Sequence, residues 1–178
     1  IDSSRGGTPI EPFIPRSAFN SHPTLKRELE LGDEGDLEAI WKLPGGVRAR
    51  DANWLPGRLF HSRLAPISHF AVRGAIWYQG ESNVGRAEPY RRQLPLMVTE
   101  WRKAFENEDL AFLAVQLPAY GKIREWPRSP WAEMRESIAL LSKTLPHTAS
   151  VVSTDCGLPD EIHPPLKRPI GARLALAA

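Results

Sequence analysis

The chain has 178 residues, of which 42% are hydrophobic and 25% charged, a balance typical of globular proteins and unlike that of disordered or fibrous chains. Its 23 basic and 21 acidic residues are interspersed and give a formal net charge of +2, so the charge pattern does not indicate a nucleic-acid partner. The single cysteine, Cys156, excludes an internal disulfide and a cysteine-based metal site.

The amino-terminal end has no signal-peptide pattern, and no apolar run is long enough to cross a bilayer. The chain does not open on methionine, so we expect it to be part of a longer protein whose earlier segments carry any targeting signal. Gly6 and Gly7 form a turn in which the backbone can approach a ligand closely, although a plain surface turn is the simpler interpretation.

The next segments are short and interrupted. Residues 24–31 and 37–43 have helical periodicity, but glycines and a proline break the region, which predicts an irregular excursion within the domain. Residues 53–66 include several large apolar side chains and predict a short helix that leads into the first strand.

The central feature is an abrupt change of pattern after residue 78. Residues 70–78 are mostly apolar on both faces, as expected of a buried parallel strand. Residues 87–105 repeat apolar side chains at three- and four-residue steps and predict a helix. Residues 79–86 are therefore a strand-to-helix loop, and in open α/β sheets such loops form ligand sites at the carboxyl ends of the strands.

The remaining segments continue this alternation. Residues 110–117 and 149–154 predict two further strands. Residues 129–145 predict a helix, with Ser129 as its amino-terminal cap and a proline at its first helical position. Residues 166–178 are helical in composition. Alternating strands and helices predict an α/β fold in one domain, with a parallel sheet and helices on both faces.

A candidate catalytic pair follows the last predicted strand. Asp160 stands three residues before His163, a spacing that lets the carboxylate accept the Nδ1 proton and leaves Nε2 free as a general base. The alternative is an acidic pair at a helix start beside an incidental histidine, because short motifs often match by accident. Spacings typical of zinc sites are absent, so no metal is predicted.

The loop after residue 78 offers side chains for acyl transfer. Ser82 lies on a strand-to-helix turn, but a nucleophile elbow needs glycine two positions after the serine, and Asn83 and Val84 intervene here. Ser82 is therefore better interpreted as a turn or capping residue. The amide groups of Gln79 and Asn83 are suited to donate hydrogen bonds to a developing oxyanion.

Taken together, the motifs resemble one known family. They are, in chain order, Gly6-Gly7-Thr8-Pro9-Ile10-Glu11, Arg73-Gly74-Ala75-Ile76-Trp77-Tyr78-Gln79-Gly80-Glu81-Ser82-Asn83 and Asp160-Glu161-Ile162-His163-Pro164. They are similar to the sialate O-acetylesterase branch of the SGNH (GDSL-like) hydrolases, and the resemblance is weakest over residues 24–50. It implies a three-layer α/β/α sandwich with a parallel central sheet, an O-acetylated carbohydrate as substrate, no cofactor, and a secreted or periplasmic protein.

The resemblance also implies roles for individual residues. The oxyanion would accept hydrogen bonds from the backbone N–H of Gly6 or Gly7 and from the side chain of Gln79 or Asn83. The general base would be His163, oriented by Asp160. Gln79 is favoured over Asn83, whose short side chain is suited to cap the following helix. Trp77, Tyr78 and Glu81 are expected to contact substrate, although core packing is the simpler interpretation for the two aromatic residues.

The nucleophile is the main departure from the family pattern. The family's serine follows its first strand in a Gly-Gln-Ser-Asn-like turn, which this chain lacks, so we expect that serine and the first strands upstream of Ile1. Three alternatives stay open. Ser82, Ser3 or Ser4 is the nucleophile; the chain is an inactive or carbohydrate-binding remnant of the fold; or the substrate is acetylated xylan in place of a sialic acid.

Overall fold

The computed structural model describes residues 1–21, 23–33, 39, 42, 54–121 and 129–178. Its backbone divides into two compact units, Ile1–Ala71 with Arg92–Glu108, and Val72–Arg91 with Asp109–Ala178. The longest helix, α4 (Ala87–Ala104), belongs to both, because its first turn lies in the second unit and the rest in the first. The organisation of the whole chain as one domain stays a prediction.

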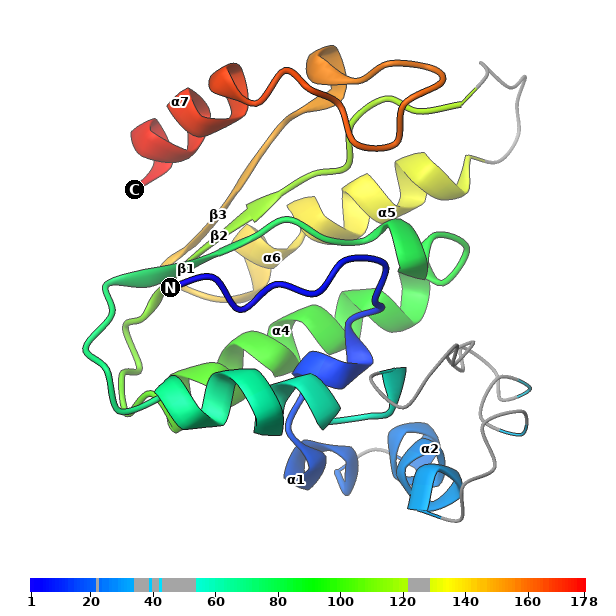
Figure 1. Cartoon of the computed structure of the whole chain (residues 1–178), viewed down its shortest axis with the longest axis vertical. Coiled ribbons are helices and arrows are strands. Elements are labelled where there is room, and N and C mark those ends of the chain that lie inside the picture. The colour runs from blue at the N-terminus through cyan, green and yellow to red at the C-terminus, as the bar shows by residue number, and fades with distance from the viewer. Residues whose placement is uncertain (22, 34–38, 40–41, 43–53, 122–128) are drawn as a thin grey trace. The chain divides into compact units, whose positions relative to one another are not determined.

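The first unit is helical in its described part (Figure 1). Besides most of α4, it contains η1 (Glu11–Phe13), α1 (Arg16–Phe19), α2 (Pro23–Asp33), the π-helical turn η3 (Phe60–Leu64) and η4 (Ala65–Ile67). The short helix predicted within residues 53–66 is confirmed. The periodicity of residues 24–31 corresponds to the regular helix α2, which continues through Gly32, so the irregular excursion predicted from the glycines was wrong for this segment. The predicted piece at 37–43 lies almost entirely outside the described residues.

The second unit holds a three-stranded parallel sheet in the order β1-β2-β3. Its elements are β1 (Gly74–Trp77), η5 (Glu81–Asn83), β2 (Ala111–Val115), α5 (Pro130–Ala139), α6 (Leu141–Thr144), β3 (Thr148–Val151), η6 (Thr154–Cys156) and α7 (Arg168–Ala177). Helix α7 lies on one side of the sheet and α5 and α6 on the other (Figure 1). The predicted parallel sheet with flanking helices is confirmed.

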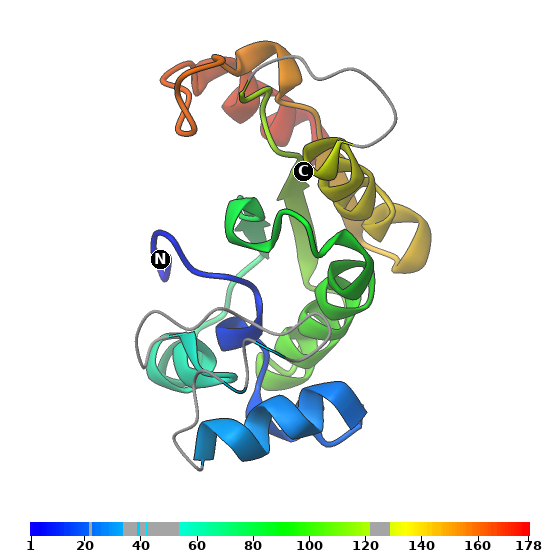
Figure 2. The same cartoon turned by 90° about the vertical axis from the view of Figure 1, so that its right-hand side faces the viewer.

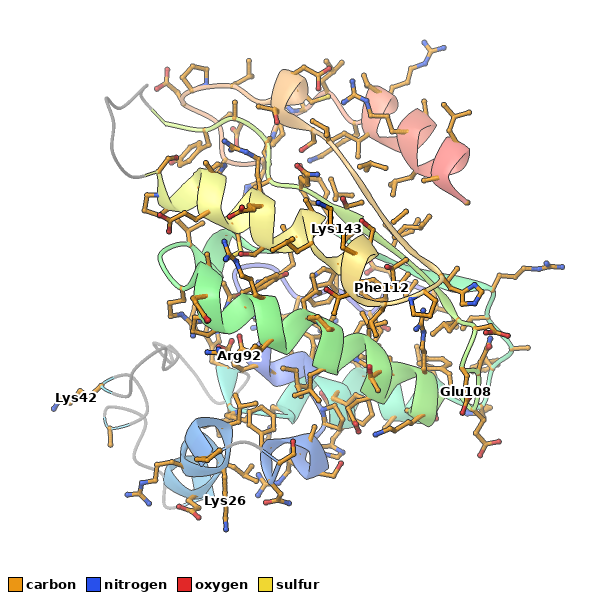
Figure 3. The ribbon with its side chains drawn as sticks, turned by 180° about the vertical axis from the view of Figure 1, so that it is seen from behind. Lys26, Lys42, Arg92, Glu108, Phe112 and Lys143 are labelled. Carbon is orange, nitrogen blue, oxygen red and sulfur yellow. The ribbon has the colours of Figure 1, made fainter. Side chains whose placement is uncertain are left out.

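The two faces of the sheet have separate apolar clusters. On the α7 face, Val115 and Val151 pack with Ile170 of the helix. On the opposite face, the rings of Trp77 and the fully buried Phe112 (labelled in Figure 3) have centroids 6.4 Å apart. Because side chains alternate along a strand, β2 contributes Phe112 to one cluster and Val115 to the other, which explains why this strand has apolar residues on both faces.

The helix patterns are confirmed in detail. The apolar stripe of α4 is buried at Tyr90, Leu94, Met97, Val98 and Trp101. Helix α5 begins as predicted, since the Ser129 hydroxyl accepts a hydrogen bond from the backbone N–H of Ala132 at 3.3 Å. The helix predicted over residues 129–145 is interrupted at Leu140, after which α6 continues for one turn.

The prediction for the first strand was wrong in extent and burial. Strand β1 covers only Gly74–Trp77, and within it Ile76 is 64% exposed, while Phe70 before it is 51% exposed. The reason is position: β1 lies at the edge of the described sheet and pairs with β2 alone among the described strands. An apolar run indicates a strand but not its place in the sheet.

Gly74 allows β1 and β2 to approach closely. A Cβ at this position would lie 2.7 Å from the carbonyl oxygen of its register partner Ala111. We expect Gly74→Ala to lower the free energy of unfolding by about 1–3 kcal/mol, because the backbone must move apart. Gly171→Ala is the control, since that helical position in α7 has nothing within 4 Å, and it should stabilise by about 0.5–1 kcal/mol. Equal effects in urea unfolding would contradict this explanation.

Candidate active site at the carboxyl edge of the sheet

The segments that follow the three strands meet at one edge of the sheet. The Gln116 backbone N–H donates to the carbonyl of Val151 at 2.9 Å, and the Ser153 hydroxyl donates to the carbonyl of Gln116 at 2.6 Å. Further out, the N–H of Gly121 donates to the carbonyl of Pro159 at 2.9 Å. The loop after β3 therefore returns to the segment after β2 (Figures 1 and 2). This edge is the place where parallel α/β sheets bind ligands.

Gln79 lies in a series of hydrogen bonds at this edge. Its Oε1 accepts from the Tyr90 hydroxyl at 2.9 Å, and its Nε2 donates to Asn83 Oδ1 at 2.8 Å. The Tyr90 oxygen in turn accepts from Trp77 Nε1 at 3.0 Å. Asn83 and Tyr90 are 0% exposed, whereas Gln79 is half-buried. Asn83 therefore lies in the interior and accepts a hydrogen bond from Gln79, whose amide lies nearer to solvent.

The turn that follows Gln79 depends on Gly80. This glycine has φ +148°, and a Cβ there would lie 3.3 Å from Leu117 and 3.4 Å from Met134. The Asn83 backbone N–H closes the turn by donating to the carbonyl of Gly80 at 2.9 Å. Ser82 lies half-buried inside this turn, in η5. That position agrees with its interpretation as a turn residue.

Charged groups join the loop after β1 to the segment after β3. Burial raises the pKa of Glu81, while the positive charges of His163 and Lys167 act in the opposite direction. Lys167 Nζ lies 4.7 Å from the ring centroid of Tyr78. Burial also raises the pKa of Tyr78, against a smaller opposing effect of Ser153. Lys167, on the segment that contains His163, thus contacts Tyr78, one of the residues expected at the site.

Among the carboxylates of its loop, His163 contacts Glu161. The Nδ1 atom of His163 lies 4.0 Å from Glu161 Oε1, and the His163 backbone N–H donates to the same oxygen at 2.7 Å. The imidazole is 81% exposed, and Asp160 is exposed on the same loop. The structure does not join Asp160 and His163 in an ion pair, so the orienting role of Asp160 stays a prediction.

The remaining candidates have contrasting positions. Trp77 is 6% exposed and packs in the interior, the arrangement that the core-packing alternative predicts. Gly6 and Gly7 are exposed and belong to the first compact unit. Gly7 has φ +67°, in agreement with the turn expected of the paired glycines. Their role as oxyanion donors stays a prediction.

An ion pair that the sequence did not indicate holds the base of the His163 loop. Arg173 of α7 contacts both oxygens of Asp155 at 2.7 Å and donates to the carbonyl of Val152 at 2.8 Å. Through its hydrogen bonds, Arg173 lowers the pKa of Asp155. Asp155 precedes the loop and Arg173 follows it, so the two ends of the loop are tied together.

In the ranges given above, no group of three or more His, Cys, Asp or Glu side chains is placed to hold a metal ion. No helix in the described part of the chain combines the length and apolar character needed to cross a membrane.

The raised pKa of Glu81 predicts a pH-dependent effect on stability. When folding raises the pKa of a carboxyl, protonation of that carboxyl stabilises the folded state. This contribution is fully present at pH values below the ordinary pKa of 4.5, and it is lost as the pH rises through the pKa of the folded state. Glu81→Gln should therefore raise the free energy of unfolding at pH 7 relative to the unmodified protein, with a smaller difference at pH 4. Urea unfolding at both values measures it, with the exposed Glu108→Gln as a control for loss of one charge. A destabilised Glu81→Gln at pH 7 would contradict the burial argument.

A parallel sheet with amide and imidazole groups at its carboxyl edge is compatible with the class of α/β ester hydrolases. The family model described as "Carbohydrate esterase, sialic acid-specific acetylesterase" matches residues 45–178. Because this match covers more than half of the chain, the chain belongs to the sialic acid-specific acetylesterase family of carbohydrate esterases. The resemblance inferred from the motifs is confirmed.

Individual relatives agree with this assignment. The chain is 24% identical to sialate O-acetylesterase of Rattus norvegicus over 212 residues and 25% identical to that of Homo sapiens over 194 residues. These alignments include 100% of the chain but 38% and 34% of the relatives. A crystal structure of a carbohydrate acetylesterase from Xanthomonas citri matches with TM-score 0.73 and 35% identity, over 97% of this chain and 34% of that one. The chain thus spans little more than a third of its relatives' length.

Proposed function

We propose that the full-length protein removes O-acetyl groups from a carbohydrate by serine-dependent ester hydrolysis, and that this chain supplies its general base, His163, and an oxyanion donor, Gln79. The proposal rests on the position of two segments in a chain of the carbohydrate esterase family. Gln79 follows Tyr78 after strand β1, and the Tyr78 ring lies 4.7 Å from Nζ of Lys167, which belongs to the segment that contains His163.

The proposed reaction is acyl transfer to water. His163 Nε2 takes the proton of a serine hydroxyl as its oxygen attacks the acetyl carbonyl, and then gives that proton to the departing sugar oxygen. Gln79 Nε2 donates to the oxyanion. Water then attacks the acyl-enzyme with His163 as base and releases acetate. Asp160 orients the imidazole, and the serine is supplied by the part of the protein outside residues 1–178.

The burial pattern supports Gln79 over Asn83 as the side-chain donor. An oxyanion donor must reach the substrate, and Asn83 is 0% exposed while its Oδ1 already accepts from Gln79. Gln79 is half-buried at the end of β1. The fixed neighbour Asn83 therefore contributes by holding the Gln79 amide.

Acetate release tests the proposal directly. The full-length protein would be incubated with O-acetylated sialic acid and with acetylated xylan oligosaccharides, and acetate would be quantified over time. Saturable release from either substrate supports esterase activity, and the ratio of kcat/KM values identifies the preferred sugar. A folded protein that binds these glycans without releasing acetate would contradict the proposal in favour of a carbohydrate-binding remnant.

A further inference from the structure

The geometry points to Tyr90 as a positioning residue that fixes the orientation of the Gln79 amide, an inference that rests on the proposed function of Gln79. Tyr90 lies in the first turn of α4, outside the loop motifs, and is 0% exposed. It therefore acts through Gln79 and does not itself contact substrate.

The direction of the hydrogen bonds is set at one end of the series. An indole N–H can only donate, so Trp77 Nε1 must point to a lone pair of the Tyr90 oxygen, 3.0 Å away. The Tyr90 hydroxyl proton is then directed to Gln79, where an acceptor lies 2.9 Å away. That acceptor is Oε1, so Nε2 is on the other side of the amide, 2.8 Å from Asn83 Oδ1.

The reversed amide would be much less favourable. Rotation by 180° would turn Oε1 of Gln79 to Oδ1 of Asn83, which places two acceptors in contact. It would also turn Nε2 to a Tyr90 oxygen that already accepts from Trp77, and would remove Oε1 as the acceptor of the Tyr90 hydroxyl. Since Tyr90 and Asn83 are fully buried, water cannot readily compensate for these losses.

A fixed amide matters for the proposed reaction because oxyanion donors act most strongly when they are already oriented before charge develops. The series joins the end of β1, the loop after it and the start of α4, all within the second compact unit. The indole and phenol thereby convert a flexible glutamine into a donor of defined direction.

A double-mutant cycle tests the inference in the full-length protein. Tyr90→Phe removes the hydroxyl with little change in shape, and we expect kcat to fall roughly tenfold with KM within about twofold. In the Gln79→Ala background, Tyr90→Phe should cause no further loss. Trp77→Phe, which removes the donor that sets the direction, should give a smaller loss that also disappears in that background. Tyr120→Phe is the control, since Tyr120 is 41% exposed and stacks on Trp131.

The outcomes separate this inference from the proposed function. If Gln79→Ala retains full turnover, the oxyanion role itself fails. If Gln79→Ala loses turnover but Tyr90→Phe does not, the positioning role is overturned while the oxyanion role stands. If the loss in Tyr90→Phe persists in the Gln79→Ala background, Tyr90 acts only through the stability of the fold, which also overturns the inference. Circular dichroism melts of all variants identify any that fail to fold, and Trp77→Phe then replaces Tyr90→Phe in the cycle.

Discussion

Replacement of His163 by asparagine in the full-length protein is expected to lower kcat for deacetylation by at least roughly 10⁴-fold, because no other group would take the proton of the serine. The imidazole is 81% exposed and has few contacts to lose, so the melting temperature should change little. Initial rates of acetate release and a thermal melt measure the two effects separately.

The matched control is His147→Asn. His147 lies just before β3, at the opposite end of that strand from His163, and its Nε2 is 3.2 Å from Asp109. It has φ +54°, a conformation that asparagine tolerates. This variant should retain turnover close to that of the unmodified protein. If His163→Asn retained turnover as well, the general base would have to be another residue.

Gln79→Ala is the second large effect that we expect. Loss of one oxyanion donor typically costs about 3 kcal/mol of transition-state stabilisation, so kcat should fall about 10²- to 10³-fold while KM changes little. The hydrogen bonds to Tyr90 and Asn83 are lost at the same time. A modest fall in melting temperature should therefore accompany the loss of turnover.

Gln79→Glu is a second test of the donor. The carboxylate keeps the shape of the side chain and an acceptor for Tyr90, but it has no N–H to donate to the oxyanion or to Asn83, and its charge repels an oxyanion. Its kcat should be at least as low as that of Gln79→Ala. Higher turnover in Gln79→Glu than in Gln79→Ala would mean that Gln79 supports the loop and does not bind the oxyanion.

The sequence predicted the parts of the fold whose patterns have a single interpretation. The stripe of α4 and the Ser129 cap of α5 define helices by local periodicity and capping, and both are present. The place of β1 at the edge of the described sheet depends on which strands pair, a tertiary property that an apolar run does not encode. The exposure of Ile76 and Phe70 could therefore not be predicted.

The sequence predicted which loops form the candidate site, but not which side chains contact one another within it. Strand-to-loop transitions placed Gln79 and His163 at the carboxyl edge, because parallel strands end on the same side. The helical periodicity predicted Tyr90 only as a core residue of the apolar stripe. No local sequence pattern links its hydroxyl to Gln79. The contact of His163 with Glu161 depends on loop backbone and rotamers, which the Asp160–His163 spacing does not determine.

Fluorophosphonate labelling of the full-length protein, with the labelled serine located by peptide mass spectrometry, tests whether His163 activates a serine outside residues 1–178. We expect one labelled serine there and a labelling rate that falls steeply in His163→Asn but not in His147→Asn. A label on Ser82, Ser3 or Ser4, or a rate that is unchanged in His163→Asn, would contradict the claim that His163 is the base for a serine supplied by another part of the protein.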